Sequence, residues 1–180
     1  SLTPPQISQQ PTDQTVCVGA TVTIKMEATV YIGAIPSSLK LMEKNGGVFS
    51  YIAPLTETRN GDKRTYTYTM TATEAMNGKE YKIELTTLQL QPSPAPPISY
   101  TTQSEVFKLN VQYLKIKTQP VAPTTPYCKG TTAASLTVVA EGNDTNYTYQ
   151  WYQNNTNSTS GATPILGANA ASYTPSTDLI

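Results

Sequence analysis

The side chains that most often carry out chemistry in proteins are scarce in this sequence. The chain has no histidine, which removes the commonest general base and the commonest metal ligand. Its only thiols are those of Cys17 and Cys128, and a catalytic thiol needs a neighbouring base to lower its pKa. We therefore expect no catalytic residue, no metal site and no cofactor, and we predict that the protein is not an enzyme.

Oxygen ligands gather at one place, where Glu141, Asn143 and Asp144 lie close together in the sequence. Their spacing is not that of a dedicated calcium loop, and no bidentate acid follows at the distance that such a loop requires. We interpret this cluster as a solvated turn. Glu80 and Glu84 share one face of a predicted strand, and an outward-facing sheet surface explains them.

The amino-acid composition indicates the fold class and excludes some classes of partner. The 180 residues include 12 basic and 12 acidic ones, spread singly, so no basic stripe suggests a nucleic-acid partner. No apolar run approaches the ~20 residues that a membrane-spanning helix needs. The 12 tyrosines, 14 prolines and 10 glycines, against two phenylalanines, are typical of short strands closed by turns. The predicted fold class is all-β, built as a sandwich.

Alternation of apolar and polar residues predicts the strands. It is clearest at residues 21–28 and recurs at 66–70, 81–85 and 107–111. One apolar and one polar face are typical of antiparallel sheets with one side in water. About seven such strands fall within about 110 residues, enough for one sandwich core.

The sequence then repeats itself. The motif at 7–11 recurs at 116–120, and Cys17-Val18-Gly19 recurs as Cys128-Lys129-Gly130 at nearly the same offset. This predicts two tandem domains, 1–113 and 114–180, joined by a short and therefore stiff link. The second domain stops before the counterparts of the last two strands, so we expect it to be an incomplete sandwich and the chain to be part of a longer one.

The first domain resembles an immunoglobulin-like domain. Tyr81, shortly after the Asn-Gly turn at 77–78, matches the tyrosine corner of that fold. The resemblance places Met26 and Ile83 at the two core cysteine positions and Met42 near the core tryptophan position. It implies that these apolar side chains fill the core without a disulfide.

The second domain resembles a narrower group, on the motifs Cys128-x-Gly130, YTYQWYQNN, GATPI and ASYTP. These motifs are similar to the immunoglobulin-like repeats of very large secreted surface proteins of Bacteroidota, of the adhesin and gliding-motility type. Trp151 would keep the core tryptophan, opposite Val138 at the first cysteine position. The resemblance implies an extracellular, cell-surface location, type IX secretion, and neighbouring repeats of the same chain as partners.

The two cysteines occupy equivalent positions of the repeat. In a head-to-tail pair they would lie about one domain length apart, ~35–40 Å, whereas a disulfide needs Cα atoms within ~7 Å. We predict no bond between them. In similar repeats this cysteine often pairs with one near the last strand, which for Cys128 would lie beyond Ile180. Cys17 would be either a small buried apolar residue or an unpaired thiol.

The longest predicted connection is the proline-rich loop at 91–100. Prolines pre-order a loop, which lowers the entropic cost of binding through it, so Pro94, Pro96, Ile98 and Tyr100 are candidate contact residues. A stiff spacer that keeps a sheet edge from pairing explains the same prolines, and we favour that interpretation.

These observations favour a stiff spacer in a surface protein, with adhesion to a surface glycan or protein as a second role. One alternative is a glycan-binding accessory module of a secreted enzyme, which tyrosines exposed on a flat face would support. The other is an assembly subunit whose missing strands are supplied by a partner chain.

Overall fold

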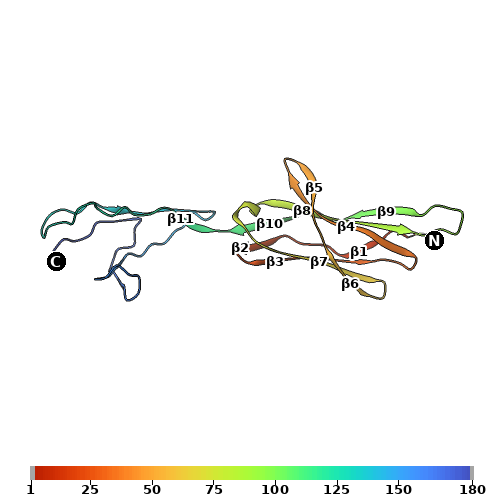
Figure 1. Ribbon diagram of the computed structural model, residues 1–180, viewed down its shortest axis with the longest axis horizontal. Coiled ribbons are helices and arrows are strands. Elements are labelled where there is room, and N and C mark those ends of the chain that lie inside the picture. The colour runs from red at the N-terminus through yellow and green to blue at the C-terminus, as the bar shows by residue number, and fades with distance from the viewer. Residues whose placement is uncertain (1–2, 179–180) are drawn as a thin grey trace. The chain divides into compact units, whose positions relative to one another are not determined.

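The computed structural model describes residues 3–178 and divides into two units, residues 1–112 and 113–180 (Figure 1). The last strand of unit 1 ends at Gln112 and the first strand of unit 2 begins at Leu114. A single residue, Tyr113, therefore separates the two strands. No helix within residues 3–178 is long and apolar enough to cross a membrane.

Unit 1 consists of two sheets that face each other (Figure 1). The first sheet is antiparallel and has the order β1 (Gln6–Gln9), β3 (Thr21–Thr29), β7 (Lys63–Thr71), β6 (Thr56–Asn60). The second has the order β2 (Gln14–Cys17), β10 (Phe107–Gln112), β8 (Lys79–Gln89), β4 (Ala34–Asn45), β5 (Val48–Pro54), and β9 (Ile98–Gln103) also pairs with β8. A short 3-10 turn, Glu74–Met76, connects β7 to β8. This strand order is that of an immunoglobulin-like sandwich, so the predicted fold class is confirmed.

The core of unit 1 lies between these sheets, and the predicted alternation identifies most of it. The inward-facing side chains of β3, β4, β7, β8 and β10 form it, and these are at most 3% exposed: Val22, Ile24, Met26, Ala28, Leu41, Tyr66, Tyr81, Ile83, Leu85, Phe107, Leu109 and Val111. Burying a large apolar side chain stabilises a fold by about 1.5–3 kcal/mol. This closed core is therefore the main source of the stability of unit 1.

The first strand of the chain is divided between the two sheets. β1 pairs with β3 in the first sheet, and after the buried Pro11 the chain crosses to the second, where β2 pairs in parallel with β10. The crossing segment also forms a hydrogen bond with β10, in which the backbone N–H of Lys108 donates to Asp13 Oδ1 at 2.7 Å. The two layers are thus joined by one continuous segment.

Two strands of unit 1 are absent from the sequence-based prediction. Thr56–Asn60 carries two charged residues and has no apolar alternation, but it pairs with β7 along its whole length. Ile98–Gln103 forms β9, although its first three residues were expected to belong to the proline-rich loop at 91–100. Both are edge strands, which keep polar residues on the faces that water reaches and so lack a strong apolar alternation.

Unit 2 contains three short antiparallel pairs. They are β11 (Leu114–Thr118) with β13 (Val139–Gly142), β12 (Leu136–Thr137) with β16 (Ser172–Tyr173), and β14 (Tyr152–Gln153) with β15 (Thr163–Pro164). In chain order, β11 corresponds to β1 of unit 1, and β12 together with β13 corresponds to β3. The strands β14, β15 and β16 correspond to β4, β5 and β7. The part of unit 2 that the structure describes has no counterpart of β8 or β10, and it buries only Ala133 and Thr177. Within the described residues, unit 2 therefore consists of two-stranded pairs without a closed core.

Candidate functional site

The structure brings three of the predicted core residues of unit 1 together and leaves out the fourth. Met26, Tyr81 and Ile83 are fully buried in one cluster. The prediction for Met42 was wrong, because Leu41 is the buried residue, directly opposite Ile83 in the pairing of β4 with β8. Met42 points to the other face, and the β4–β5 register shifts between these two residues. Adjacent apolar residues at such a bulge leave the inward side ambiguous in the sequence.

Tyr81 occupies the tyrosine-corner position without its characteristic hydrogen bond. Its ring stacks on that of Phe107 with centroids 5.8 Å apart. Its hydroxyl is buried without a hydrogen bond of ordinary geometry, and burial together with the nearby Glu43 carboxylate raises the pKa of Tyr81. The turn before Tyr81 is bonded to β10 through Asn77 instead. Asn77 Oδ1 accepts a hydrogen bond from the backbone N–H of Val111 at 2.9 Å.

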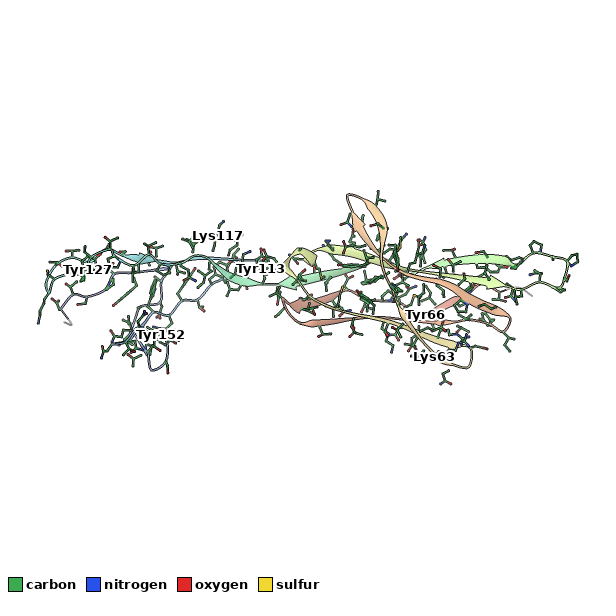
Figure 2. The ribbon with its side chains drawn as sticks, in the orientation of Figure 1. Lys63, Tyr66, Tyr113, Lys117, Tyr127 and Tyr152 are labelled. Carbon is green, nitrogen blue, oxygen red and sulfur yellow. The ribbon has the colours of Figure 1, made fainter. Side chains whose placement is uncertain are left out.

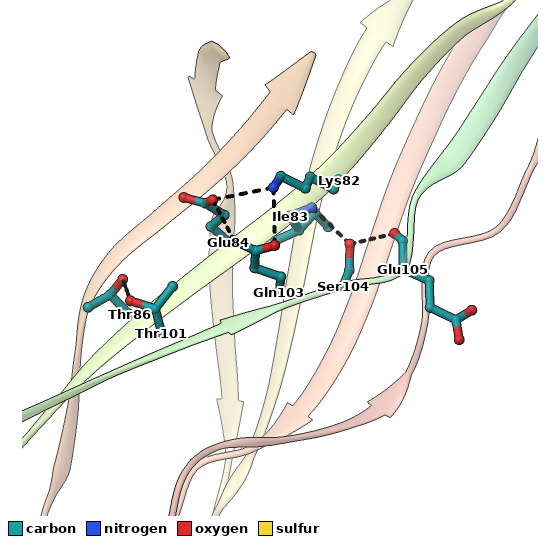
Figure 3. A network of polar contacts seen from close by, with 8 residues as sticks. All are labelled: Lys82, Ile83, Glu84, Thr86, Thr101, Gln103, Ser104 and Glu105. Atoms are coloured by element: carbon teal, nitrogen blue, oxygen red, sulfur yellow. Dashed lines mark hydrogen bonds and ion pairs between the residues drawn. The ribbon is translucent and has the colours of Figure 1, made fainter. Parts of the chain in front are cut away.

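A buried serine joins β9 to β10. Figure 3 shows Ser104 Oγ accepting from the backbone N–H of Ile83 at 2.8 Å and donating to the carbonyl of Glu105 at 2.8 Å. Ser104 is 7% exposed. Between β9 and β10 the hydroxyl of Ser104 accepts from the N–H of Ile83 in place of a backbone carbonyl. The buried backbone of β8 therefore keeps its hydrogen bond at this point. The sequence carries no motif that singles out this residue.

The predicted contact loop is divided in the structure. Pro94 and Pro96 lie in an exposed connection between β8 and β9. Ile98 and Tyr100 do not belong to this loop, because they are paired with Gln89 and Thr87 in the sheet. Tyr100 is half-buried. The four residues therefore do not form one contact surface on a loop.

Most tyrosines of the predicted strands are packed rather than displayed. Tyr66 lies between the sheets of unit 1 (Figure 2) and is fully buried, and burial with the nearby Glu57 raises its pKa. Tyr147 and Tyr149 of unit 2 are half-buried. This arrangement counts against a flat tyrosine platform for sugars.

Apolar side chains are exposed along β5, the edge strand of the second sheet. The exposed fractions are 68% for Val48, 53% for Tyr51 and 40% for Ile52. The ring of Phe49 between them is covered by lysine, with Lys82 Nζ 4.7 Å from its centroid. The β4–β5 hairpin extends beyond the two layers of unit 1 (Figure 1). The uncharged run at 48–53, directly after the Asn-Gly-Gly turn, is the sequence signal that could have identified this edge.

Unit 2 has an open apolar groove of about 430 Å³ in place of a closed core. Its lining includes Leu114, Ile116, Val138, Ala140, Tyr147 and Trp151. Trp151 is held in place because its Nε1–H donates to the carbonyl of Ala170 at 2.8 Å and its ring lies 5.8 Å from that of Tyr173. Val138 and Trp151 thus line one groove. In unit 1, β8 and β10 cover the corresponding surface.

The remaining candidates for chemistry are dispersed. Cys17 and Cys128 are both free and exposed, so of the two alternatives for Cys17 the structure fits the unpaired thiol and not the buried apolar residue. Asn143 Oδ1 accepts from the N–H of Tyr113, and Asp144 Oδ1 accepts from that of Asn146. Residues 3–178 contain no group of three or more histidine, cysteine or acidic side chains that could hold a metal ion.

Comparisons with known proteins find similar solved structures but no similar sequence family. No protein-family model matches the chain, and no curated protein matches its sequence significantly. Murine CRIg is 13% identical, with a TM-score of 0.46, over 61% of this chain and 98% of that chain. The I67–I69 fragment of titin is 11% identical, with a TM-score of 0.43, over 86% of this chain and 48% of that chain.

A third structure, of Dpr11 IG1 bound to DIP-gamma IG+IG2, is 14% identical over 77% of this chain and 66% of that chain, with a TM-score of 0.41. The fold is immunoglobulin-like. At these TM-scores that statement rests on the strand order and pairing of the sheets. These similarities therefore do not identify any residue of this chain as a partner-binding residue.

Proposed function

We propose that the chain is a non-catalytic segment of a large secreted bacterial surface protein, of the adhesin or gliding-motility type found in Bacteroidota. In this proposal immunoglobulin-like units follow one another outside the cell and hold a distal binding region away from its surface. The sequence motifs of unit 2 support the type of protein. The single-residue connection at Tyr113 leaves no separate linker between the last strand of unit 1 and the first strand of unit 2, which supports units that follow one another directly along the chain.

The observation that carries the spacer role is the parallel pairing of β2 with β10. Residues 14–17 pair with residues 109–112, and the backbone N–H of Val18 extends this ladder to the carbonyl of Gln112 at 2.9 Å. Tension on unit 1 pulls β2 towards its N-terminal end and β10 towards its C-terminal end. In a parallel pair these forces act along the strands and load all the hydrogen bonds of the ladder together. A unit closed in this way resists stretching.

Single-molecule stretching of the chain between its ends tests this role. Val18→Pro removes the N–H that bonds to Gln112, whereas Val18→Ala keeps it and shortens the same exposed side chain. We expect the proline variant to unfold unit 1 at a clearly lower force and the alanine variant to match the original chain. Equal unfolding forces for all three chains would contradict a load-bearing β2–β10 pair.

A second candidate is an assembly subunit, which the open groove of unit 2 favours. The groove is apolar, and the equivalent surface of unit 1 is covered by two strands, so a partner chain could complete unit 2 by adding strands. The intact mass of the native polypeptide separates the two roles. A mass of several hundred kilodaltons supports the surface-protein proposal, whereas a mass close to that of these 180 residues would favour the assembly subunit.

A further inference from the structure

β5 differs from two other edge strands of unit 1, β6 and β9, in having neither charge nor covering, and its seven residues make it longer than the uncharged edge strands β1 and β2, which have four residues each. β6 carries Glu57 and Arg59, charged residues of the kind that protect edges from pairing. β9 begins directly after Pro96-Pro97, and the side chain of Thr102 bonds to the carbonyl of Pro5 next to it. β5 instead presents the uncharged sequence VFSYIA at residues 48–53, followed by Pro54 at the end of the strand, and its outer backbone groups are unpaired by any described strand. Such an edge is a template for a further strand.

The sequence of this edge is complementary to itself when read in the opposite direction. Val-Phe-Ser-Tyr-Ile, residues 48–52, has serine at its centre, an aromatic residue on each side and a β-branched residue at each end. An antiparallel pair of two such strands centred on Ser50 places Phe49 opposite Tyr51 and Val48 opposite Ile52. Aromatic and β-branched pairs of this kind stabilise neighbouring strands, and no like charges meet.

We propose that β5 pairs antiparallel with β5 of a second copy of this chain, around a twofold axis through Ser50. The second sheet then continues from one molecule into the other. The β4–β5 hairpin extends beyond the body of unit 1, so two copies can approach along this edge (Figure 1). The bulge at Ile52, where β4 and β5 lose register, ends the regular edge and limits the pairing to about five residues.

So short a contact is weak. Stable dimers bury on the order of 1,200–2,000 Å², and a five-residue edge with two symmetry-related aromatic pairs on its face falls below this range. One pair of chains should therefore exchange rapidly, whereas many units in series would hold together through multivalency. The pairing is independent of the spacer role, which rests on β2 and β10 and is tested by stretching.

Disulfide trapping tests the proposed register. In a Cys17→Ser, Cys128→Ser background, Ser50→Cys places two cysteines directly opposite each other, with Cα atoms about 4.5–5.5 Å apart, within reach of a disulfide. We expect covalent dimers under mild oxidation. Val48→Cys is the matched control, because it is equally accessible on the same strand but its two copies would lie roughly 13 Å apart.

Mixing Val48→Cys with Ile52→Cys chains should restore the bond, since these two positions face each other in the proposed pair. Without cysteine, sedimentation velocity at rising concentration should show self-association that Tyr51→Lys abolishes. It should persist in Val106→Lys, which adds the same charge at a similarly exposed apolar site away from β5. Dimer yields of Ser50→Cys no higher than those of Val48→Cys, or equal effects of the two lysine variants, would overturn the proposal.

Discussion

Replacing Ser104 by alanine should destabilise unit 1 by about 2 kcal/mol. The change removes the hydroxyl that accepts from the backbone N–H of Ile83 at 2.8 Å. Ile83 is fully buried, so water cannot replace the lost acceptor, and an orphaned buried donor costs about 1–3 kcal/mol. The carbonyl of Glu105 also loses a partner, but this residue is exposed and can bond to water.

Urea unfolding with two probes measures this loss. Trp151 is the only tryptophan and lies in unit 2, so its fluorescence follows that unit. The near-ultraviolet circular dichroism of the buried Tyr66 and Tyr81 follows unit 1. For slopes of about 1–3 kcal/mol per molar urea, the midpoint of unit 1 should fall by about 1 M. The fluorescence transition should not move.

The matched control is Thr101→Val on the same strand pair. The Thr86–Thr101 hydroxyl bond is 3.0 Å long but exposed, so water replaces it (Figure 3). We expect a change of less than about 0.5 kcal/mol. If Ser104→Ala and Thr101→Val shift the midpoint equally, the argument from a buried, singly satisfied N–H is refuted.

Three further predictions concern the core, the pH response and unit 2. In denaturant melts, Leu41→Ala should cost about 2–5 kcal/mol and Met42→Ala less than about 1 kcal/mol; the reverse order would restore the original core assignment. Burial, the largest single cause, raises the pKa of Glu43, but hydrogen bonds from Lys79, Asn45 and Tyr81 and the charge of Lys79 together outweigh it, so this pKa is lowered from its ordinary 4.5. Its stabilising effect is thus present above 4.5 and lost as pH falls through the lower folded value, a loss that Glu43→Gln should diminish. A Cβ at Gly142 would collide with the carbonyl of Tyr113, so Gly142→Ala should lower the fluorescence midpoint of unit 2.

Local alternation predicted the strands whose inner faces are strictly apolar. Residues 22–28 and 107–111 were assigned inward and outward sides correctly, because each has an uninterrupted period of two. The assignment of Met42 failed because Leu41 precedes it and a bulge separates the two, so sequence period alone does not decide which points inward.

Features that depend on residues far apart in the sequence could not be predicted from local sequence patterns. The acceptor for the N–H of Ile83 is the hydroxyl of Ser104, 21 residues away and beyond the predicted loop at 91–100. The exposure of β5 likewise depends on its position at the end of a sheet, which is set by strand order and not by the strand itself. The groove at Trp151 was foreseeable only in part, from the absence of two strands in the repeat.

The division of the first strand between two sheets also governs when unit 1 can form. β2 pairs with residues 95 positions later in the sequence, and Gln10 and Asp13 bond to the backbone of the same distant segment. Such high contact order makes folding slow, since a long loop must close before these pairs contribute. During synthesis from the N-terminus, the sandwich cannot close until residue 112 is available. Until then its apolar strand faces remain open to wrong partners.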